Sequence, residues 1–203
     1  MLLDELMPVF DATRIEHRVI GGSCAEVYEA VLRADFRRAF SESTAARLLV
    51  GVRTTAERLV AAVRPSVSAP TEDSGEAMTL AGLEGHGQYV LLGVDRPHEI
   101  VFGMIGRFWG GETRWEQIDA SEFGSFDHPG LARIACNFSL RPYGEARTLV
   151  SYETRTRATD AASQRSFLRY WRVASPLAGV VLRAQLAVVA REAATRTAAQ
   201  VPC

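Results

Sequence analysis

The C-terminal third of the chain restricts the possible folds more than any other part. Residues 147–159 (RTLVSYETRTRAT) have a β-strand pattern, and after Asp160 about 36 residues follow a helical pattern without a Gly–Gly or Pro–Gly break. The face that this helix is expected to bury carries Phe167, Tyr170, Trp171, Ala174, Ala178, Val181, Leu182, Gln185 and Val189, whereas Arg165, Arg169, Arg172 and Arg183 fall on the other side. A long helix that follows antiparallel strands buries its apolar face against their sheet, and it covers a hollow where the sheet is curved.

Length and composition predict one globular domain, residues 1–203. The hydrophobic fraction of 47% and the charged fraction of 23% are ordinary for a soluble protein. The net charge of −1 gives no overall field that would recruit nucleic acid or an anionic membrane. All 23 basic residues are arginines, so Schiff-base catalysis, covalent pyridoxal phosphate and the lysine of a phosphate-binding loop are excluded. We expect no cofactor.

Cysteine usage and targeting signals indicate a reducing, cytoplasmic location. Cys24, Cys136 and Cys203 are odd in number and widely spaced. The first ten residues (MLLDELMPVF) contain two acids and no basic residue, which is a poor signal peptide. The apolar stretch from Pro176 to Leu182 stops at Arg183, so we expect no membrane span.

The N-terminal half is expected to contain one strand and two helices. Thr13 to Ile20 has a strand pattern, and Ser23 with Glu26 forms a capping box for a helix that ends near Ala34. Residues 44–63 have a second helical pattern, and residues 64–75 (RPSVSAPTEDSG) are typical of a mobile loop.

Strands dominate the middle of the chain. The expected strands are 88–94, 99–107, 131–140 and 147–158, with a weaker strand at 114–119 and a short helical turn at 121–126. The order of one strand, two helices, several antiparallel strands and a long helix predicts an α+β fold.

This order resembles the START/polyketide-cyclase-like (SRPBCC, helix-grip) superfamily, and at residue level a bacterial branch of it, from about Thr13 to Ala194. The similar residues are Gly106-Arg107-Phe108-Trp109, Phe126 with Pro129-Gly130, Glu153-Thr154-Arg155, Ala158-Thr159-Asp160, and Phe167 with Tyr170-Trp171. The resemblance implies a curved antiparallel sheet wrapped around the C-terminal helix, with a cavity between them. It implies a binding habit and brings no established catalytic set.

A row of charged residues on the last strand is the first candidate for chemistry. Because side chains alternate along a strand, Glu153, Arg155 and Arg157 share one face. If that face lines the hollow, Glu153 is a candidate general base and Arg155 a candidate anion clamp. If it is the outer, solvated face of the sheet, these residues form cross-strand ion pairs, which we favour because burying three charges is costly.

Five residues are candidates for ligand binding. Arg107 ends a mostly apolar strand beside Trp109, where it either holds an anionic head group at a cavity mouth or forms a structural ion pair. Tyr170, Trp171 and Ala174 lie near the start of the long helix on its apolar side, and they are either plain core or the lining of a cavity. The hydroxyl of Tyr170 is a candidate hydrogen-bond donor to a ligand and a candidate acid–base group.

The histidines do not predict a metal site. His17, His86, His98 and His128 lie in different expected elements, without acid or cysteine at ligand spacing.

Three functions from different classes remain open. The leading hypothesis is a protein that holds an apolar or amphipathic molecule, lipid-like or polyketide-like, between the sheet and the long helix. The second is an enzyme of cyclase, dehydratase or hydrolase type that uses Glu153, Arg107 or Tyr170. The third is a protein–protein interaction module without a ligand. The oligomeric state stays open, with a homodimer as one option.

Overall fold

The structure is a computed structural model, and it describes residues 1–38, 78–82, 88–110 and 113–199. The helix expected at 44–63 and the loop expected at 64–75 lie outside the described residues. In chain order the described elements are α1 (Leu2–Leu6), β1 (Ala12–Gly21), α2 (Cys24–Arg33), β2 (Val90–Asp95), β3 (Glu99–Arg107), β4 (Arg114–Glu116), α5 (Ala120–Phe123), β5 (Ala132–Pro142), β6 (Arg147–Ala158) and α6 (Ala161–Ala199).

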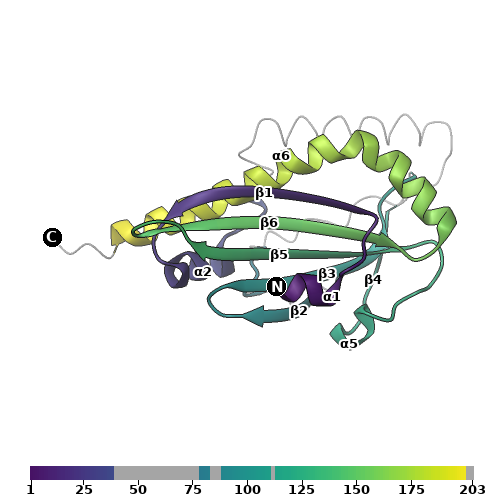
Figure 1. Cartoon of the computed structure of the whole chain (residues 1–203), viewed down its shortest axis with the longest axis horizontal. Helices are drawn as coiled ribbons and strands as arrows, with labels where there is room; N and C mark the ends of the chain where they lie inside the picture. Colours follow the sequence, from purple (N-terminus) through teal and green to yellow (C-terminus); the bar gives the residue numbers. More distant parts are fainter. Residues whose placement is uncertain (39–77, 83–87, 111–112, 200–203) are drawn as a thin grey trace.

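The strands form one antiparallel sheet in the order β1-β6-β5-β3-β2, with β4 paired to β3 (Figure 1). The sheet is curved, and α6 arches along it on the side of β1 (Figure 1). This arrangement of a curved antiparallel sheet and a long C-terminal helix confirms the predicted α+β, helix-grip fold.

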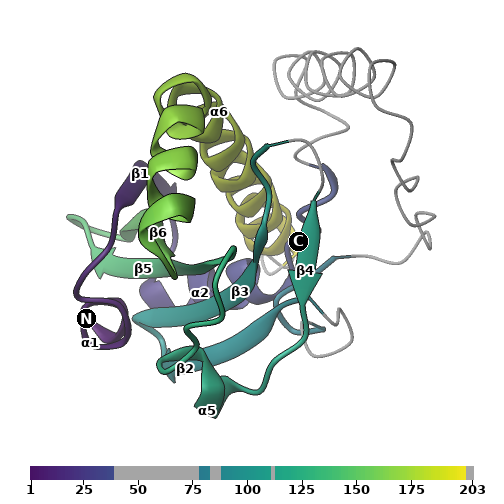
Figure 2. The same cartoon turned by 90° about the vertical axis from the view of Figure 1, so that its right-hand side faces the viewer.

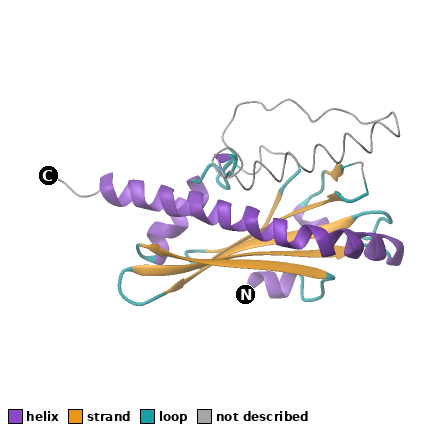
Figure 3. Ribbon diagram, turned by 90° about the horizontal axis from the view of Figure 1, so that it is seen from above, coloured by secondary structure: helices purple, strands orange, loops and turns teal. Residues whose placement is uncertain are grey.

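The long helix begins at a cap that the sequence supplies directly. The carboxylate of Asp160 accepts hydrogen bonds from the backbone N–H of Ala162 (2.8 Å) and Ser163 (3.0 Å) and from the Ser163 hydroxyl (2.6 Å). The same carboxylate accepts a bond of 2.7 Å from the backbone N–H of Gly130, which fixes the start of α6 to the loop before β5. The helix continues through Pro176, which lies at an exposed position. Figure 3 shows α6 running along the length of the strands.

The most apolar 18 residues of α6 have a mean hydropathy of 1.7, so by length and composition this helix is able to cross a membrane. The sequence prediction missed this because it counted only the uninterrupted stretch before Arg183. One such helix is weak evidence for a span, since core helices of soluble proteins meet the same criterion. Here α6 packs on β1, β6 and α2.

Each face of the sheet is covered by helices (Figure 2). The larger core lies between the sheet, α2 and α6, and its buried members include Val27, Tyr28, Val31, Leu186 and Val189. A second, smaller core lies on the opposite face beneath α1 and α5, and it contains Leu3, Met7, Val101, Ile105 and Phe123. The sequence did not predict α1, because five residues are too short for a periodic signal.

Candidate functional site

A cavity of about 170 Å³ lies between the sheet and the middle of α6. Strands β3, β5 and β6 form its floor, and one turn of α6 forms its roof. The described residues of its lining are Phe36, Met78, Thr79, Leu80, Tyr89, Phe102, Met104, Cys136, Phe138, Tyr152, Thr154, Val181, Leu182 and Gln185.

Stacked aromatic rings form much of the floor. Phe138 and Tyr152 lie opposite each other on β5 and β6, and their ring centres are 4.2 Å apart with an interplanar angle of 10°. Phe36 stacks on Phe138 at 5.6 Å, and Phe102 lies 6.4 Å from Phe138. Phe102, Phe138 and Tyr152 come together because alternate side chains of neighbouring strands share one face. The floor therefore presents flat, apolar ring surfaces.

The polar groups in the lining are neutral. The thiol of Cys136 donates to the hydroxyl of Thr154, which lies directly opposite on β6, at 3.3 Å. Burial raises the pKa of the Cys136 thiol to about 11, and burial raises the pKa of the Tyr152 hydroxyl well above its usual range. None of the lining residues that the structure describes is an Asp, Glu, Lys, Arg or His.

The roof carries an amide oxygen without a partner. Gln185 follows Val181 and Leu182 by four and three positions, so all three share one face of α6. The Oε1 atom of Gln185 is buried and accepts no hydrogen bond in the structure. A buried acceptor that is left unsatisfied costs about 1–3 kcal/mol, so this atom is a marker for a missing donor.

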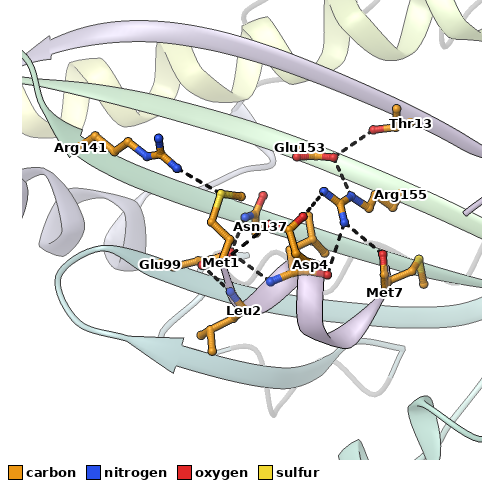
Figure 4. A network of polar contacts seen from close by, with 11 residues as sticks. Met1, Leu2, Asp4, Met7, Thr13, Glu99, Asn137, Arg141, Glu153 and Arg155 are labelled. Carbon is orange, nitrogen blue, oxygen red and sulfur yellow. Dashed lines mark hydrogen bonds and ion pairs between the residues drawn. The ribbon is translucent and has the colours of Figure 1, made fainter. Parts of the chain in front are cut away.

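The charged row on β6 lies on the opposite face of the sheet from this cavity. Tyr152 and Thr154 line the cavity, and alternation therefore directs Glu153 and Arg155 to the other side. Both are buried there, with exposed fractions of 8% and 7%. The Nε of Arg155 donates to Oε1 of Glu153 at 2.7 Å, and its terminal nitrogens contact Asp4 (2.7 Å) and the carbonyl of Met7 (3.0 Å) (Figure 4). The charged residues thus lie on the face away from the cavity, but the expected solvated, cross-strand pairing is wrong, because Glu153 and Arg155 are buried and pair with each other within β6.

Sequence reasoning missed the residue that holds the other end of α1. Glu99 is 3% exposed, and its carboxylate accepts hydrogen bonds from the backbone N–H of Leu2 (2.8 Å) and from Nδ2 of Asn137 (2.6 Å) (Figure 4). The negative charge of Glu99 lies at the N-terminal end of α1, and the positive charge of Arg155 lies at the carbonyls of its C-terminal end. Both charges are favourable with respect to the helix dipole. An acid at the start of an otherwise apolar strand was the available signal.

Four of the five predicted ligand-binding residues belong to an aromatic cluster near the start of α6 or adjoin it. Trp109 is 2% exposed and lies 5.5 Å from Phe167 between ring centres, and Trp171 lies 5.8 Å from the same ring. Tyr170 contacts Phe108 at 5.9 Å. The Nε of Arg107 donates to the backbone carbonyl of Trp109 at 3.3 Å.

None of these residues, nor the partly exposed Ala174, lines the 170 Å³ cavity, which begins about two turns further along α6. The packing around Phe167 fills the space beneath the first part of the helix. A ligand-binding role for these positions stays a prediction.

The candidate acid–base groups do not converge on one pocket. Glu153 pairs with Arg155 on the other face of the sheet, Arg107 is at the end of β3, and Tyr170 packs against Phe108. Within the described residues no group of three or more His, Cys, Asp or Glu side chains is arranged to hold a metal ion.

Comparison with known proteins gives distant structural similarities. No family model and no curated protein matches the chain. A conserved protein of Geobacillus kaustophilus is similar over 91% of this chain and 96% of its own, with 11% identity and a TM-score of 0.40. A protein of Mesorhizobium loti is similar over 89% of this chain and 98% of its own, with 12% identity and a TM-score of 0.37.

A third similar structure is the di-domain ARO/CYC protein BexL of the BE-7585A biosynthetic pathway. It is 12% identical with a TM-score of 0.32, and the match covers 93% of this chain and 52% of that protein. This chain thus corresponds to about half of that protein's length. Membership of the START/polyketide-cyclase-like superfamily stays a prediction.

Proposed function

We propose that this protein binds a small apolar or amphipathic molecule in the cavity between the sheet and α6. The observation that carries the proposal is the combination of stacked rings at Phe138 and Tyr152 with the unpartnered Oε1 of Gln185 in one lining. Ligand sites are mostly apolar hollows with a few placed polar groups, and this lining has that composition.

The size of the cavity favours a ring over a long chain. Its volume of about 170 Å³ is close to that of an engineered apolar cavity of about 150 Å³ that binds benzene. Pockets for drug-sized ligands measure roughly 300–1,000 Å³, so a whole lipid is too large for the described hollow. Of the two expected ligand types, the flat walls favour a polyketide-like ring.

The other two hypotheses receive less support. An enzyme needs acid–base groups at one pocket, and Glu153 lies on the wrong face of the sheet to serve this one. A protein–protein module is favoured by exposed apolar residues on α6, such as Val173 with 75% of its surface exposed. An open hollow in the core is a feature that an interaction module does not need.

Native mass spectrometry and thermal unfolding test the proposal. We expect gently purified protein to retain a small molecule, or a panel of single-ring and fused-ring compounds to raise its melting temperature. A protein that carries no extra mass and gains no stability from any compound of the panel would contradict it.

A matched pair of variants locates the site along α6. Val181→Phe should fill the cavity and abolish the stabilisation by the ring compounds, because Val181 is in the lining. Ala174→Phe adds an aromatic ring two turns earlier and should leave that stabilisation in place. Loss of binding in the Ala174 variant alone would move the site to the aromatic cluster around Trp171.

A further inference from the structure

We infer that the ligand is an uncharged molecule of single-ring size that carries a hydroxyl or N–H group, and that Gln185 selects it by accepting that hydrogen at Oε1. This inference rests on the proposed function and specifies the class of ligand. It also assigns a specificity role to one residue of the long helix.

The size limit comes from the volume of the hollow. The volume of about 170 Å³ is slightly larger than that of the engineered cavity of roughly 150 Å³ that binds benzene. One six-membered ring with a small substituent therefore fills the hollow. The stacked rings of Phe138 and Tyr152 offer the flat surface against which such a ring packs.

The charge limit comes from the lining. Its described members include no Arg, Lys or His to pair with an anion and no carboxylate to pair with a cation. An ion that enters this hollow gains no opposite charge from the described lining residues, and an uncompensated loss of hydration costs far more for an ion than for a neutral polar group. A weak acid is therefore expected to bind only in its protonated form.

The hydrogen-bond requirement comes from Gln185. Its Oε1 is buried without a donor, whereas the thiol of Cys136 is already committed to Thr154. A ligand hydroxyl or N–H that reaches Oε1 donates the hydrogen bond that this acceptor lacks. A ligand of the same shape without a donor leaves this acceptor unpaired, and sites that hydrogen-bond a ligand discriminate strongly against such analogues.

Phenol and toluene test the role of Gln185, because they differ only in a hydroxyl that replaces a methyl group. We expect the ratio of the toluene Kd to the phenol Kd, measured by titration calorimetry, to fall about tenfold in Gln185→Leu. Comparing ratios removes the difference in hydration between the free ligands, since it is common to both proteins. Gln117→Leu, an exposed position away from the cavity, should keep the ratio of the unchanged protein.

Benzoic acid tests the charge limit on the unchanged protein, so this measurement stands even if the Gln185 variant fails to fold. Its apparent affinity should decrease about tenfold for each pH unit above the pKa of the free acid, while phenol binding stays constant over the same range. Benzoate that binds at pH 8 as tightly as phenol, or a Kd ratio unchanged in Gln185→Leu, would overturn the inference and leave the proposed function intact. Failure of phenol to bind, while another compound of the panel stabilises the protein, would overturn the inference alone, whereas a panel without any binding compound would overturn the proposed function as well.

Discussion

Glu153 and Arg155 form a buried ion pair on the face of the sheet that α6 does not cover, with Nε of Arg155 2.7 Å from Oε1 of Glu153. Thr13 on β1 adds a hydrogen bond of 3.2 Å to the same carboxylate oxygen. Through Asp4 and the carbonyl of Met7, Arg155 also holds α1 against the sheet. The pair thus joins β1, β6 and the N-terminal helix, which is a structural task.

Arg155→Met should lower the free energy of unfolding by about 3–5 kcal/mol, because it leaves the carboxylate of Glu153 buried without its cation. Urea denaturation measures the change. Arg157→Met is the matched control: the same substitution two residues further along β6, at an exposed position, should change the free energy of unfolding by less than about 0.5 kcal/mol. Equal decreases in the free energy of unfolding for the two variants would show that the buried ion pair does not stabilise the protein more than an exposed arginine does.

The cap of α6 predicts a dependence of stability on acid. The hydroxyl and backbone N–H of Ser163, followed by the backbone N–H of Gly130, hold the pKa of Asp160 well below its usual range. A carboxyl with a depressed folded-state pKa contributes stability that is present above the unfolded-state pKa of about 3.9 and is lost as the pH falls below it.

Asp160→Asn should therefore be less stable than the unchanged protein at pH 7, and the difference should shrink as the pH falls from 5 toward 2. Urea denaturation at several pH values measures it. Ser163→Ala removes one of the donors and should show the same trend with a smaller amplitude. A difference that stays constant from pH 7 to pH 2 would contradict this assignment of the cap.

Much of the fold was predictable from local patterns. The expected strand 147–158 coincides with β6, and the capping box of Ser23 and Glu26 starts α2 as predicted. The long helix follows from spacing alone. Such patterns succeed because backbone hydrogen bonding and solvent exposure repeat with a fixed period in each element.

Which face of β6 points inward was harder to predict, because both faces are covered. Tyr152 is buried on the face that α6 covers and Glu153 is buried on the opposite face, so polarity does not mark a single solvent side. Helix α1, which Arg155 contacts on that face, is five residues long and leaves no periodic signal. Long-range contacts between residues 2–7 and Arg155 of β6 determine which face of the strand carries the charged residues.

The position of the cavity along α6 could not be predicted from the periodicity of the apolar residues either. Spacing identified the buried face of the helix, on which both Ala174 and Gln185 lie. Where a gap opens beneath that face depends on the volumes of side chains from other parts of the chain, such as Trp109 beneath the first turns. A glutamine within an apolar stripe was the one local signal for the polar group in the roof.

The aromatic cluster near the start of α6 predicts a large stability effect. Trp109 is 2% exposed and packs on Phe167, so Trp109→Ala should lower the free energy of unfolding by about 3–5 kcal/mol. Trp171→Ala, at a partly exposed position against the same ring, should cost less. Denaturant unfolding compares the two variants. A near-neutral Trp109 variant that loses ligand binding would instead support the predicted ligand-binding role.

The two described cysteines should differ in their reactivity toward iodoacetamide at pH 8. Burial raises the pKa of the Cys136 thiol to about 11, so very little reactive thiolate forms there, and only 5% of the residue is exposed. Cys24 is partly exposed at the start of α2. Peptide mass spectrometry, which distinguishes the two sites, should find Cys24 alkylated and Cys136 unmodified in the native protein.

Two further measurements separate burial from low intrinsic reactivity. Both cysteines should react in guanidinium chloride, because unfolding returns the Cys136 thiol to water and to its ordinary pKa. The raised pKa also implies stability that is fully present below the ordinary thiol value of 9.0 and is lost as the pH rises from there toward 11. Cys136→Ala should flatten the decline in unfolding free energy over this interval. Native alkylation of Cys136 at the rate of Cys24 would show that the cavity floor is open to solvent.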